Sequence, residues 1–431
     1  MTNLSWTKNL KKPIAIIGLG KSGMSAVRFL KAIGYQDSDI VTFDSKDPQA
    51  QFSLAEDLLR VEPQTLVVSP GVPLQLPWIQ SLVQGGAYLT SELSLATSVL
   101  TTEKIIGITG SVGKSTVTSI LGEGARVMDD HSFVGGNLGT PFCEYALRIT
   151  KEERKASWVL LELSSYQLEN CEHLSLIGAA VTFLSANHLE RYENLDHYYK
   201  TKMKITEITS NFCVFNKNSE DAVQLSRHSK CPAILTSSED FIDQALLSSI
   251  VLIGAHNKDN FCVAAEVAHL AEWSAESLQA MAQFRGLNHR LEYVAEVEGV
   301  KYINDSKATA MESVLVAVAG CIEQLGENNS VYLLLGGKDK NLPWHQLALL
   351  QQDKNIQCVF FGACGKLAKE KTGLTGPYFE NLGFAIEHCQ KNSKRGDVVL
   401  LSPGGTSLDE FKNFEERGDF FKRLVLASAE A

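Results

Sequence analysis

The sequence of 431 residues lacks the features that mark membrane, disulfide-rich or nucleic-acid-binding proteins. No apolar run approaches the ~18 residues of a membrane span, and Ile14 to Gly20 is too short and glycine-broken for a signal peptide. The nine cysteines are scattered and contain no C-x-x-C pair, which favours reduced cytoplasmic thiols over zinc or disulfides. A net charge of -10 without a dense basic run argues against a nucleic-acid partner.

What remains is an ordinary globular composition, with 44% hydrophobic and 21% charged residues. The chain length predicts two to four domains. Neither an internal repeat nor a low-complexity segment interrupts it.

The strongest local signal is a glycine-rich turn between an apolar run and a helix. Ile105 to Ile108 predicts a strand, and T-G-S-V-G-K-S-T over 109–116 leads into a helical pattern. Such a turn presents backbone N–H groups, a helix N-terminus, a lysine and a hydroxyl to phosphate and Mg²⁺. The full pattern wants a glycine at position 108, where Ile108 stands. The alternative is an ordinary strand-to-helix turn; the context favours a nucleoside triphosphate site.

An earlier glycine pattern begins the chain's first α/β segment. Ile14 to Ile17 predicts a buried parallel strand, and G-L-G-K-S-G over 18–23 opens a helix. A second strand ends at Asp44, placed to meet a ribose hydroxyl, and a third precedes Ser69. This Rossmann-like half suits a dinucleotide, a mononucleotide or a diphosphate, and three glycines could also serve only a tight turn.

Polar residues follow the strands predicted after the phosphate loop. Glu162 ends the strand Val159 to Leu161, where an acid can hold Mg²⁺ in an open α/β sheet. The next strand, 179–184, delivers His188, which we expect to contact ligand rather than to serve structure alone. The segment 134–139 predicts a glycine-rich loop, and the three lysines of the helix 198–205 would ordinarily form a solvated face. Residues 219–249 carry little pattern and suggest an irregular edge.

The remainder of the sequence predicts a hinge followed by another Rossmann-like domain. Gly254 to Asn260 starts a helix with amides suited to a base or ribose, although Asn257 could simply cap a helix from Lys258. The segment 283–292 resembles a hinge, and 293–303 a hairpin. Three strand-like runs, each followed by a glycine loop, complete an α/β pattern.

Taken together, seven segments resemble the Mur ligase family, and the resemblance spans essentially the whole chain. The segments are T-G-S-x-G-K-S-T, E-L-S-S-Y-Q-L, N-H-L-E-R-Y, G-x-H-N-x-x-N, H-R-L-E, N-D-S-K-A-T and S-L-D-E-F-K-N-F-E-x-R-G.

The resemblance implies a three-domain α/β protein with a Rossmann-like N-terminal domain, a central P-loop ATPase-like domain and a Rossmann-like C-terminal domain. We expect boundaries of 1–95, 96–286 and 287–431. The implied activity is ATP- and Mg²⁺-dependent amide ligation through an acyl phosphate, in cytoplasmic peptidoglycan precursor synthesis. The two ends of the chain indicate the member that adds D-glutamate to UDP-N-acetylmuramoyl-L-alanine. A monomer with small-molecule partners, and with neither nucleic acid nor membrane, is expected.

The resemblance also implies roles for individual residues. Four would be catalytic: Lys114, Glu162, His188 and Lys202. ATP would be bound by Gly110, Gly113, Lys114, Ser115, Thr116, Asn257, Asn260, Arg290 and Asp305. The metal would be held by Ser115, Glu162, His188 and Lys202, with Lys202 as a carbamate.

Two further sets complete the implied substrate sites. The UDP-substrate would be held by Gly20, Lys21, Ser22, Asp44, Ser45, Ser69, Pro70, Gly71 and Asn137. The incoming amino acid would meet Thr309, Lys340, Ser407 and the backbone of Phe414. The sequence departs from the family at Ser185-Ala186-Asn187, where an acid usually precedes the histidine, and in the glycine content of 402–406.

Three other functions compete with the ligase. A nicotinamide-dependent oxidoreductase built on Gly18 to Asp44 leaves the Lys114 loop without a task. A small-molecule P-loop kinase does not need the last Rossmann-like domain. A non-catalytic nucleotide-regulated protein does not need Glu162, His188 and Lys202 together.

Overall fold

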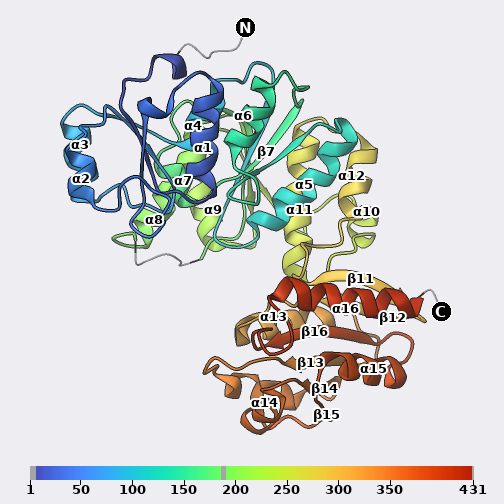
Figure 1. Ribbon diagram of the computed structural model, residues 1–431. Helices are drawn as coiled ribbons and strands as arrows, with labels where there is room; N and C mark the ends of the chain where they lie inside the picture. The colour runs from blue at the N-terminus through green and yellow to red at the C-terminus, as the bar shows by residue number, and fades with distance from the viewer. Residues whose placement is uncertain (1–5, 186–190, 430–431) are drawn as a thin grey trace. The chain divides into compact units, whose positions relative to one another are not determined.

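Three β-sheets, each with flanking helices, make up the computed structural model, which describes residues 6–185 and 191–429 (Figure 1). By its internal contacts the chain divides into two units. The first unit comprises Met1–Ile242 and Asp259–Met281, and it holds the first two sheets. The second comprises Asp243–Lys258 and Ala282–Ala431, and it holds the third.

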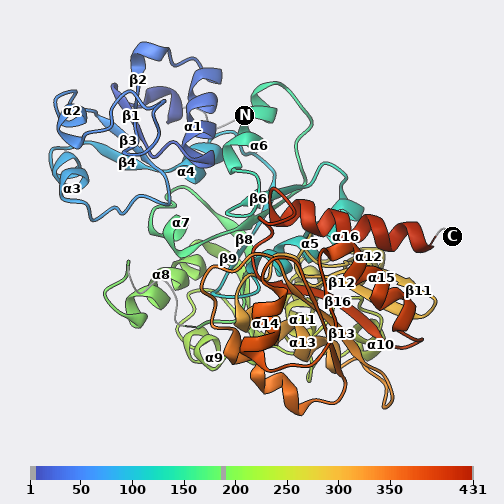
Figure 2. The same ribbon diagram turned by 60° about the horizontal axis from the view of Figure 1, so that its bottom comes forward.

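The first sheet is parallel, with strand order β2-β1-β3-β4. Every residue of β1 (Ile14–Ile17) is buried, because helices cover both faces of the strand. Helices α1 and α4 pack on one face, and α2 and α3 on the other (Figure 2). The other elements are η1 (Thr7–Asn9), α1 (Lys21–Ala32), η2 (Asp37–Asp39), β2 (Ile40–Phe43), α2 (Ala55–Leu59), β3 (Thr65–Val68), α3 (Pro77–Gln84), β4 (Tyr88–Thr90) and α4 (Glu92–Thr97).

The second sheet is also parallel, with strand order β10-β9-β8-β5-β7-β6. Strand β5 (Lys104–Thr109) lies between β7 and β8, so three loops leave the middle of the sheet at one edge. The other elements are α5 (Lys114–Met128), β6 (Phe133–Gly136), α6 (Phe142–Thr150), β7 (Trp158–Glu162), α7 (Ser165–Glu169), β8 (Leu176–Val181), α8 (Leu195–Glu207), β9 (Thr209–Asn216), α9 (Glu220–Ser226), β10 (Ala233–Thr236), α11 (Ala255–Leu270) and α12 (Ala275–Ala282).

The third sheet is mixed, with strand order β11-β12-β16-β13-β14-β15. Strands β11 and β12 form the predicted hairpin, which turns at Glu298 and Gly299, both with positive φ. Helices α13 and α14 with η3 pack on one face, and α15 and α16 on the other. The elements are α10 (Gln244–Ser248), β11 (Glu292–Val297), β12 (Val300–Asn304), α13 (Met311–Ile322), β13 (Val331–Gly336), η3 (Trp344–Gln352), β14 (Ile356–Phe361), α14 (Gly365–Thr372), β15 (Tyr378–Phe379), α15 (Leu382–Asn392), β16 (Val398–Gly404) and α16 (Phe414–Ala429).

These sheets confirm the predicted α/β class, while the predicted boundaries of three domains stay a prediction. Two local predictions were wrong. The first half of the expected loop 134–139 is strand, because 133–136 pair in parallel with β7. The expected irregular segment 219–249 contains α9, the edge strand β10 and α10.

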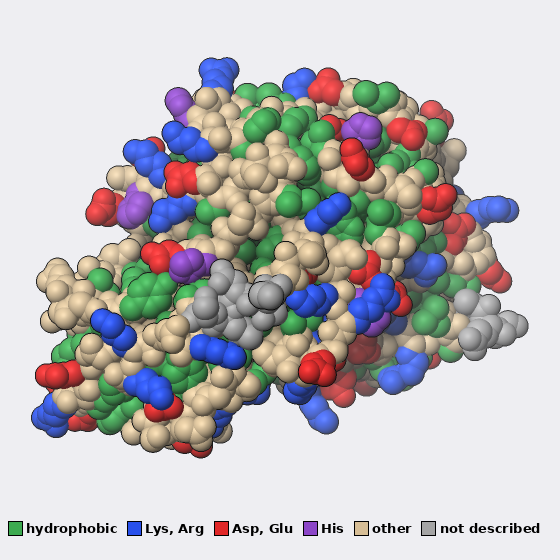
Figure 3. All heavy atoms as spheres, turned by 90° about the horizontal axis from the view of Figure 1, so that it is seen from above, with side chains coloured by type: hydrophobic (Ala, Val, Ile, Leu, Met, Phe, Trp, Pro, Cys, Tyr) green, Lys and Arg blue, Asp and Glu red, His purple; other side chains and the backbone are tan. Residues whose placement is uncertain are grey.

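The surface and the helices give two further observations. No helix within 6–185 and 191–429 is long and apolar enough to cross a membrane. On the face shown in Figure 3, lysine and arginine side chains are dispersed among acidic ones rather than gathered into one basic patch.

Candidate active site

The loop between β5 and α5 has the backbone of a phosphate cradle. Gly110 and Gly113 adopt φ values of +145° and +92°, which other residues rarely take. A Cβ on Gly110 would lie 1.9 Å from Oγ1 of Thr182, and one on Gly113 would lie 2.4 Å from Oδ1 of Asn260. Ile108 is buried inside β5 and pairs with both neighbouring strands, so the turn begins after it. The loop therefore requires glycine where it bends and not at 108.

Two lysine amines lie on one carbonyl of this loop. Nζ of Lys114 donates to the oxygens of Gly110 and Ser111, both at 3.0 Å. Nζ of Lys202, from α8, donates to the same Gly110 oxygen at 2.7 Å. Lys202 is only 2% exposed, and burial, aided by the charge of Lys114, lowers its pKa to about 7 although Glu162 acts in the opposite direction. The expected solvated face was therefore wrong for Lys202, whose amine loses its proton more easily than an exposed lysine.

Glu162 is buried at the end of β7, beside the start of α5. Its Oε2 accepts a hydrogen bond from Oγ of Ser115 at 2.7 Å, and its Oε1 accepts one from Nδ2 of Asn137 at 2.6 Å. The pairing of β5 with β7, in register from Lys104 and Trp158 to Ile108 and Glu162, brings the carboxylate to the loop. Ser115 and Glu162, distant in sequence, thus present oxygen atoms at one sheet edge, and Asn137 holds the carboxylate there through its amide nitrogen.

Oxygen is the ligand type that Mg²⁺ prefers, so Ser115 and Glu162 suit such an ion. Within 6–185 and 191–429, no cluster of three His, Cys, Asp or Glu side chains could hold a metal by itself. The predicted ligand His188 lies outside the described residues. An oxygen-based set would thus draw on Ser115 and a modified Lys202 as well as on Glu162.

Tyr198 and Thr182 support the loop from behind, and sequence reasoning missed both. Lys202 lies one helical turn after Tyr198 on α8, and its Nζ is 4.7 Å from the centre of the Tyr198 ring. The hydroxyl of Tyr198 lies 3.1 Å from Oγ of Ser111. Oγ1 of Thr182 donates to the carbonyl of Val112 at 2.6 Å. The spacing of four between Tyr198 and Lys202 could have indicated that they share a helix face.

The first sheet carries a second glycine loop, closed by side chains of its own. Oδ2 of Asp44 accepts from N–H of Leu19 at 2.9 Å, and its Oδ1 accepts from N–H of Lys46 at 2.9 Å. These backbone hydrogen bonds, first that from Leu19, lower the pKa of Asp44. Oγ of Ser69 donates to the carbonyl of Gly18 at 2.7 Å. Asp44 therefore holds the loop itself, besides any bond to a ribose.

The predicted UDP-substrate residues lie at the carboxyl ends of the first sheet's strands and at the end of β6. A cavity of about 480 Å³ is lined by Gly20 and Lys21 from the first sheet and by Gly139 and Thr140 from the second. No atom lies within 4 Å of a Cβ built on Gly20, which leaves room for close approach. The others are placed as follows: Ser22 in α1, Ser45 after β2, Ser69, Pro70 and Gly71 after β3, and Asn137 after β6.

The predicted nucleotide residues outside the loop are divided between the units. Asn260 belongs to the first unit and abuts Gly113. Asn257 belongs to the second, and its Nδ2 donates to the carbonyl of Ile253 at 2.7 Å. Helix α11 begins at Ala255, so Asn257 lies in its first turn and does not cap a helix from Lys258. Thr116 lies in the first turn of α5.

Asp305 and Arg290 lie in the second unit, near the end of β12. Oδ2 of Asp305 accepts from Oγ of Ser402 at 2.9 Å, and Oδ1 from N–H of Leu291 at 3.2 Å. Burial raises the pKa of Asp305 to about 7, against the opposing effect of these bonds and of Arg290. The side chain of Arg290 is exposed, and its backbone forms an isolated antiparallel β-bridge with Leu287.

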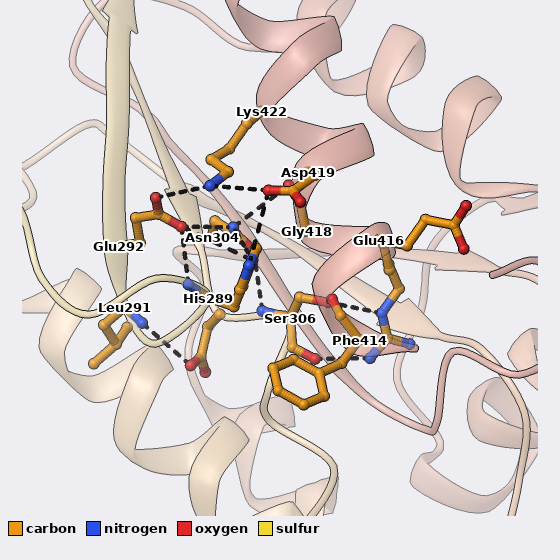
Figure 4. A network of polar contacts seen from close by, with 12 residues as sticks. His289, Leu291, Glu292, Asn304, Ser306, Phe414, Glu416, Gly418, Asp419 and Lys422 are labelled. Carbon is orange, nitrogen blue, oxygen red and sulfur yellow. Dashed lines mark hydrogen bonds and ion pairs between the residues drawn. The ribbon is translucent and has the colours of Figure 1, made fainter. Parts of the chain in front are cut away.

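A polar network behind Asp305 fixes the start of β11 to α16 (Figure 4). Glu292 accepts from N–H of His289 at 2.9 Å, from Nδ2 of Asn304 at 2.8 Å and from Nζ of Lys422 at 3.1 Å. Burial, followed by the charge of Lys422, lowers the pKa of His289, so its imidazole is neutral at pH 7. The network therefore holds the residues next to Arg290 without needing a charged histidine.

Arg417, from α16, binds the loops that follow β12 and β16 and is also missing from the predicted site residues. Its guanidinium is fully buried and donates to Oγ of Ser306 at 3.0 Å, the carbonyl of Ser306 at 2.8 Å and that of Gly405 at 3.1 Å. Burial lowers its pKa to about 10, which still leaves it charged. The sequence could have indicated Arg417 as a site residue, because it is the arginine of the last family motif, 407–418.

The predicted amino-acid site lies on loops at the carboxyl edge of the third sheet. The loops after β13 and β16 are joined by two backbone hydrogen bonds between Lys338 and Thr406, at 2.7 and 2.9 Å. Lys340 is exposed on the first of these loops, whereas Ser407 is buried on the second. Thr309 follows β12, and the carbonyl of Phe414 accepts from Oγ of Ser306 at 2.8 Å. Their joint role stays a prediction.

Comparisons with known proteins agree with this geometry. Residues 108–268 match the family described as Mur ligase middle domain. The UDP-N-acetylmuramoylalanine--D-glutamate ligase of Myxococcus xanthus (strain DK1622) is 33% identical over 460 residues, covering 96% of this chain and 98% of that protein.

Two solved structures share the fold. A UDP-N-acetylmuramoyl-L-alanyl-D-glutamate--2,6-diaminopimelate ligase gives a TM-score of 0.60 at 14% identity, over 93% of this chain and 94% of that one. The MurF ligase of Thermotoga maritima, in complex with ADP, gives a TM-score of 0.56 at 13% identity, over 92% of this chain and 97% of that one.

Proposed function

The chain belongs to the Mur ligase family, among its UDP-N-acetylmuramoylalanine--D-glutamate ligases, and from this premise we propose how its residues share the reaction. It is an ATP-dependent ligase that joins D-glutamate to UDP-N-acetylmuramoyl-L-alanine in peptidoglycan precursor synthesis. The observation that best supports the assignment of residues is the meeting of Lys114, Lys202, Ser115 and Glu162 at one glycine loop.

Two steps connect the substrates. An oxygen of the UDP-substrate's carboxylate bonds to the γ-phosphorus of ATP as the bond to ADP breaks, which gives an acyl phosphate. The glutamate amine then bonds to the carbonyl carbon, loses a proton, and the C–O bond to phosphate breaks. Little of this needs covalent participation by the protein, so positioning and charge carry the catalysis.

Lys114 and the loop N–H groups hold the phosphoryl group during its transfer. The amine of Lys114 already lies on the loop carbonyls, within reach of an anion bound at the start of α5. Thr116, Gly110 and Gly113 complete this phosphate site. Mg²⁺, held by Ser115, Glu162, His188 and Lys202, supplies positive charge to the phosphate oxygens when bound.

Lys202 enters this metal set as a carbamate. An ammonium beside Mg²⁺ is unfavourable, because like charges repel strongly where water is scarce. The burial of Lys202 and its contact with Gly110 support this role over that of a surface lysine, whereas Lys200 is exposed and pairs with Asp196 at 2.7 Å. Addition of CO₂ to its neutral amine forms an N–C bond and releases one proton, and the resulting carbamate anion provides oxygen ligands.

The remaining residues bind the rest of the three substrates. Asn257, Asn260, Arg290 and Asp305 hold the nucleoside and phosphates of ATP. Gly20, Lys21, Ser22, Asp44, Ser45, Ser69, Pro70, Gly71 and Asn137 hold the UDP-sugar. Thr309, Lys340, Ser407 and the backbone of Phe414 hold the glutamate, whose carboxylates need cationic and hydroxyl partners.

The enzyme works in the cytoplasm as a monomer on small molecules, without nucleic acid or membrane. The net charge of -10 and the dispersed basic side chains support the absence of a nucleic-acid partner.

A coupled phosphate-release assay tests the function. Release should require ATP, Mg²⁺, D-glutamate and UDP-N-acetylmuramoyl-L-alanine together, and omission of any one should reduce it to background. Phosphate release at the same rate with and without D-glutamate would indicate a nucleotide-regulated protein or a kinase. Hydride transfer with NADH would indicate the oxidoreductase.

A further inference from the structure

One arginine outside the predicted site joins the first two sheets of the chain. Nη1 of Arg191 donates to the carbonyl of Pro70 at 2.9 Å, and Nη2 donates to that of Val72 at 3.3 Å. Arg191 precedes α8 of the second sheet, whereas Pro70 and Val72 follow β3 of the first. The guanidinium therefore spans two backbone carbonyls of the loop 69–72, which carries three of the proposed UDP-substrate residues.

The guanidinium is itself held on two sides. Its Nη2 pairs with Oε2 of Glu169 at 2.8 Å, and both side chains are only 8% exposed. Its Cζ lies 4.1 Å from the ring centre of Tyr166, and Oε1 of Glu169 accepts from the hydroxyl of Tyr192 at 2.7 Å. A planar fork fixed by a carboxylate and a ring can present two donors at defined positions, which a lysine cannot do.

Two partners of Arg191 come from the helix that directly follows the strand of the metal carboxylate. Tyr166 and Glu169 belong to α7, which starts three residues after Glu162. Asn170, directly after α7, donates from Nδ2 to the carbonyl of Thr90 at the end of β4, at 2.9 Å. One short helix thus connects the Glu162 strand to the loop 69–72 through Arg191.

The space beside Arg191 is too small for a substrate. Arg191, Ser69, Pro70 and Gln167 line a cavity of only about 10 Å³, which has room for about one water molecule. Arg191 must therefore act on the UDP-sugar through the loop and not by touching it.

We propose that Arg191 is a positioning residue for the UDP-substrate, which sets the backbone of residues 69–72 relative to the Glu162 edge of the second sheet. The inference rests on the proposed function, in which this loop holds the UDP-sugar. A purely structural brace would instead affect all substrates and the stability together.

Steady-state kinetics of Arg191→Lys tests this. Lysine keeps the positive charge but cannot donate to both the Pro70 and the Val72 carbonyls in the same geometry, so we expect the KM for the UDP-substrate to rise about tenfold. The KM for ATP and kcat should change less than about twofold, and the melting temperature little. Glu169→Gln, which keeps Arg191 but loosens it, should give a smaller rise in the same KM. Arg60→Lys, at an exposed arginine that follows α2 beside the first sheet, is the control and should match wild type.

The outcomes separate the hypotheses. An unchanged KM for the UDP-substrate in Arg191→Lys, or equal changes in both KM values, would overturn the positioning role. If Arg191→Lys does not fold, Glu169→Gln decides by the same KM comparison. In Arg191→Gly, partial recovery of the KM with added methylguanidinium would support it. Failure of wild type to release phosphate with both substrates would instead refute the proposed function.

Discussion

The loop after β1 and the loop after β5 share a glycine-rich turn between a buried parallel strand and a helix, but different side chains bind the backbone of each loop. Asp44 and Ser69 close the first loop. Lys114 and Lys202 lie on the second, next to a buried Glu162. Glycine spacing therefore defines the backbone of both loops, whereas residues distant in sequence decide which chemistry each can support.

Replacing Lys114 by alanine should cause the largest loss, because it removes the charge that distinguishes the second loop. We expect kcat to fall about a thousandfold, in line with the loss of a preorganised group at developing charge. Phosphate release and a melting curve measure activity and folding. A folded, fully active Lys114→Ala protein would refute the ATP site. The exposed Lys151→Ala should behave as wild type.

Alanine at Gly110 and at Gly20 tests how tightly each turn is packed. Gly110→Ala should lower the free energy of unfolding by about 3 kcal/mol, because its Cβ would overlap Thr182 at a φ of +145°. Gly20 has a φ of -60° and open space around its Cβ, so Gly20→Ala should change stability by less than about 0.5 kcal/mol. Denaturant titration compares the two, and equal losses would contradict the contrast.

Replacing Lys202, the α8 lysine that donates to the Gly110 carbonyl, distinguishes a carbamate from a simple cation. Lys202→Ala should lower kcat about a hundredfold, and short carboxylic acids should restore part of it, because they supply the missing oxygen ligands. Lys200→Ala is the control on the exposed side of α8 and should stay active. An active Lys202→Ala, or an unmodified amine in crystals grown with bicarbonate, would rule the carbamate out.

The loop after β1 should show the smallest effect. Asp44→Asn loses charge-assisted bonds to backbone N–H groups, and we expect UDP to bind about fivefold more weakly, by calorimetry on the full chain. NADH should not compete with UDP in either protein. Tight NADH binding would instead support the alternative that the glycine loop 18–23 binds a dinucleotide.

Much of the fold could be predicted because its signals are local. The apolar runs at 14–17, 105–108 and 331–335 became strands β1, β5 and β13, and the turn at Glu298 and Gly299 closed the expected hairpin. Short edge strands such as β4 and β15 were missed, because two or three residues carry no periodicity. Strand β6 was taken for a loop because its glycines hide a pairing that depends on β7.

The site was less predictable, because burial depends on contacts across the fold. The three lysines at 200, 202 and 204 look alike in sequence, yet packing buries Lys202 on the Gly110 carbonyl. Only the family resemblance distinguished it. Arg191 and Arg417 belong to two of the family motifs, but the sequence did not show which groups they bind, since each donates to backbone more than a hundred residues away.

The hydrogen bonds between Arg417 and Ser306 have a consequence for folding during synthesis. Ser306 leaves the ribosome 111 residues before its partner, so the loops at this edge stay without their buried cation for most of the synthesis of the second unit. Domains fold as they emerge, N-terminal parts first. A nascent chain can therefore assemble its β5 loop early, but Arg417 cannot fix the loops of the proposed glutamate site until helix α16 has been translated. Ribosome-bound chains stalled before Arg417 should accordingly hold ATP without consuming it in ligation.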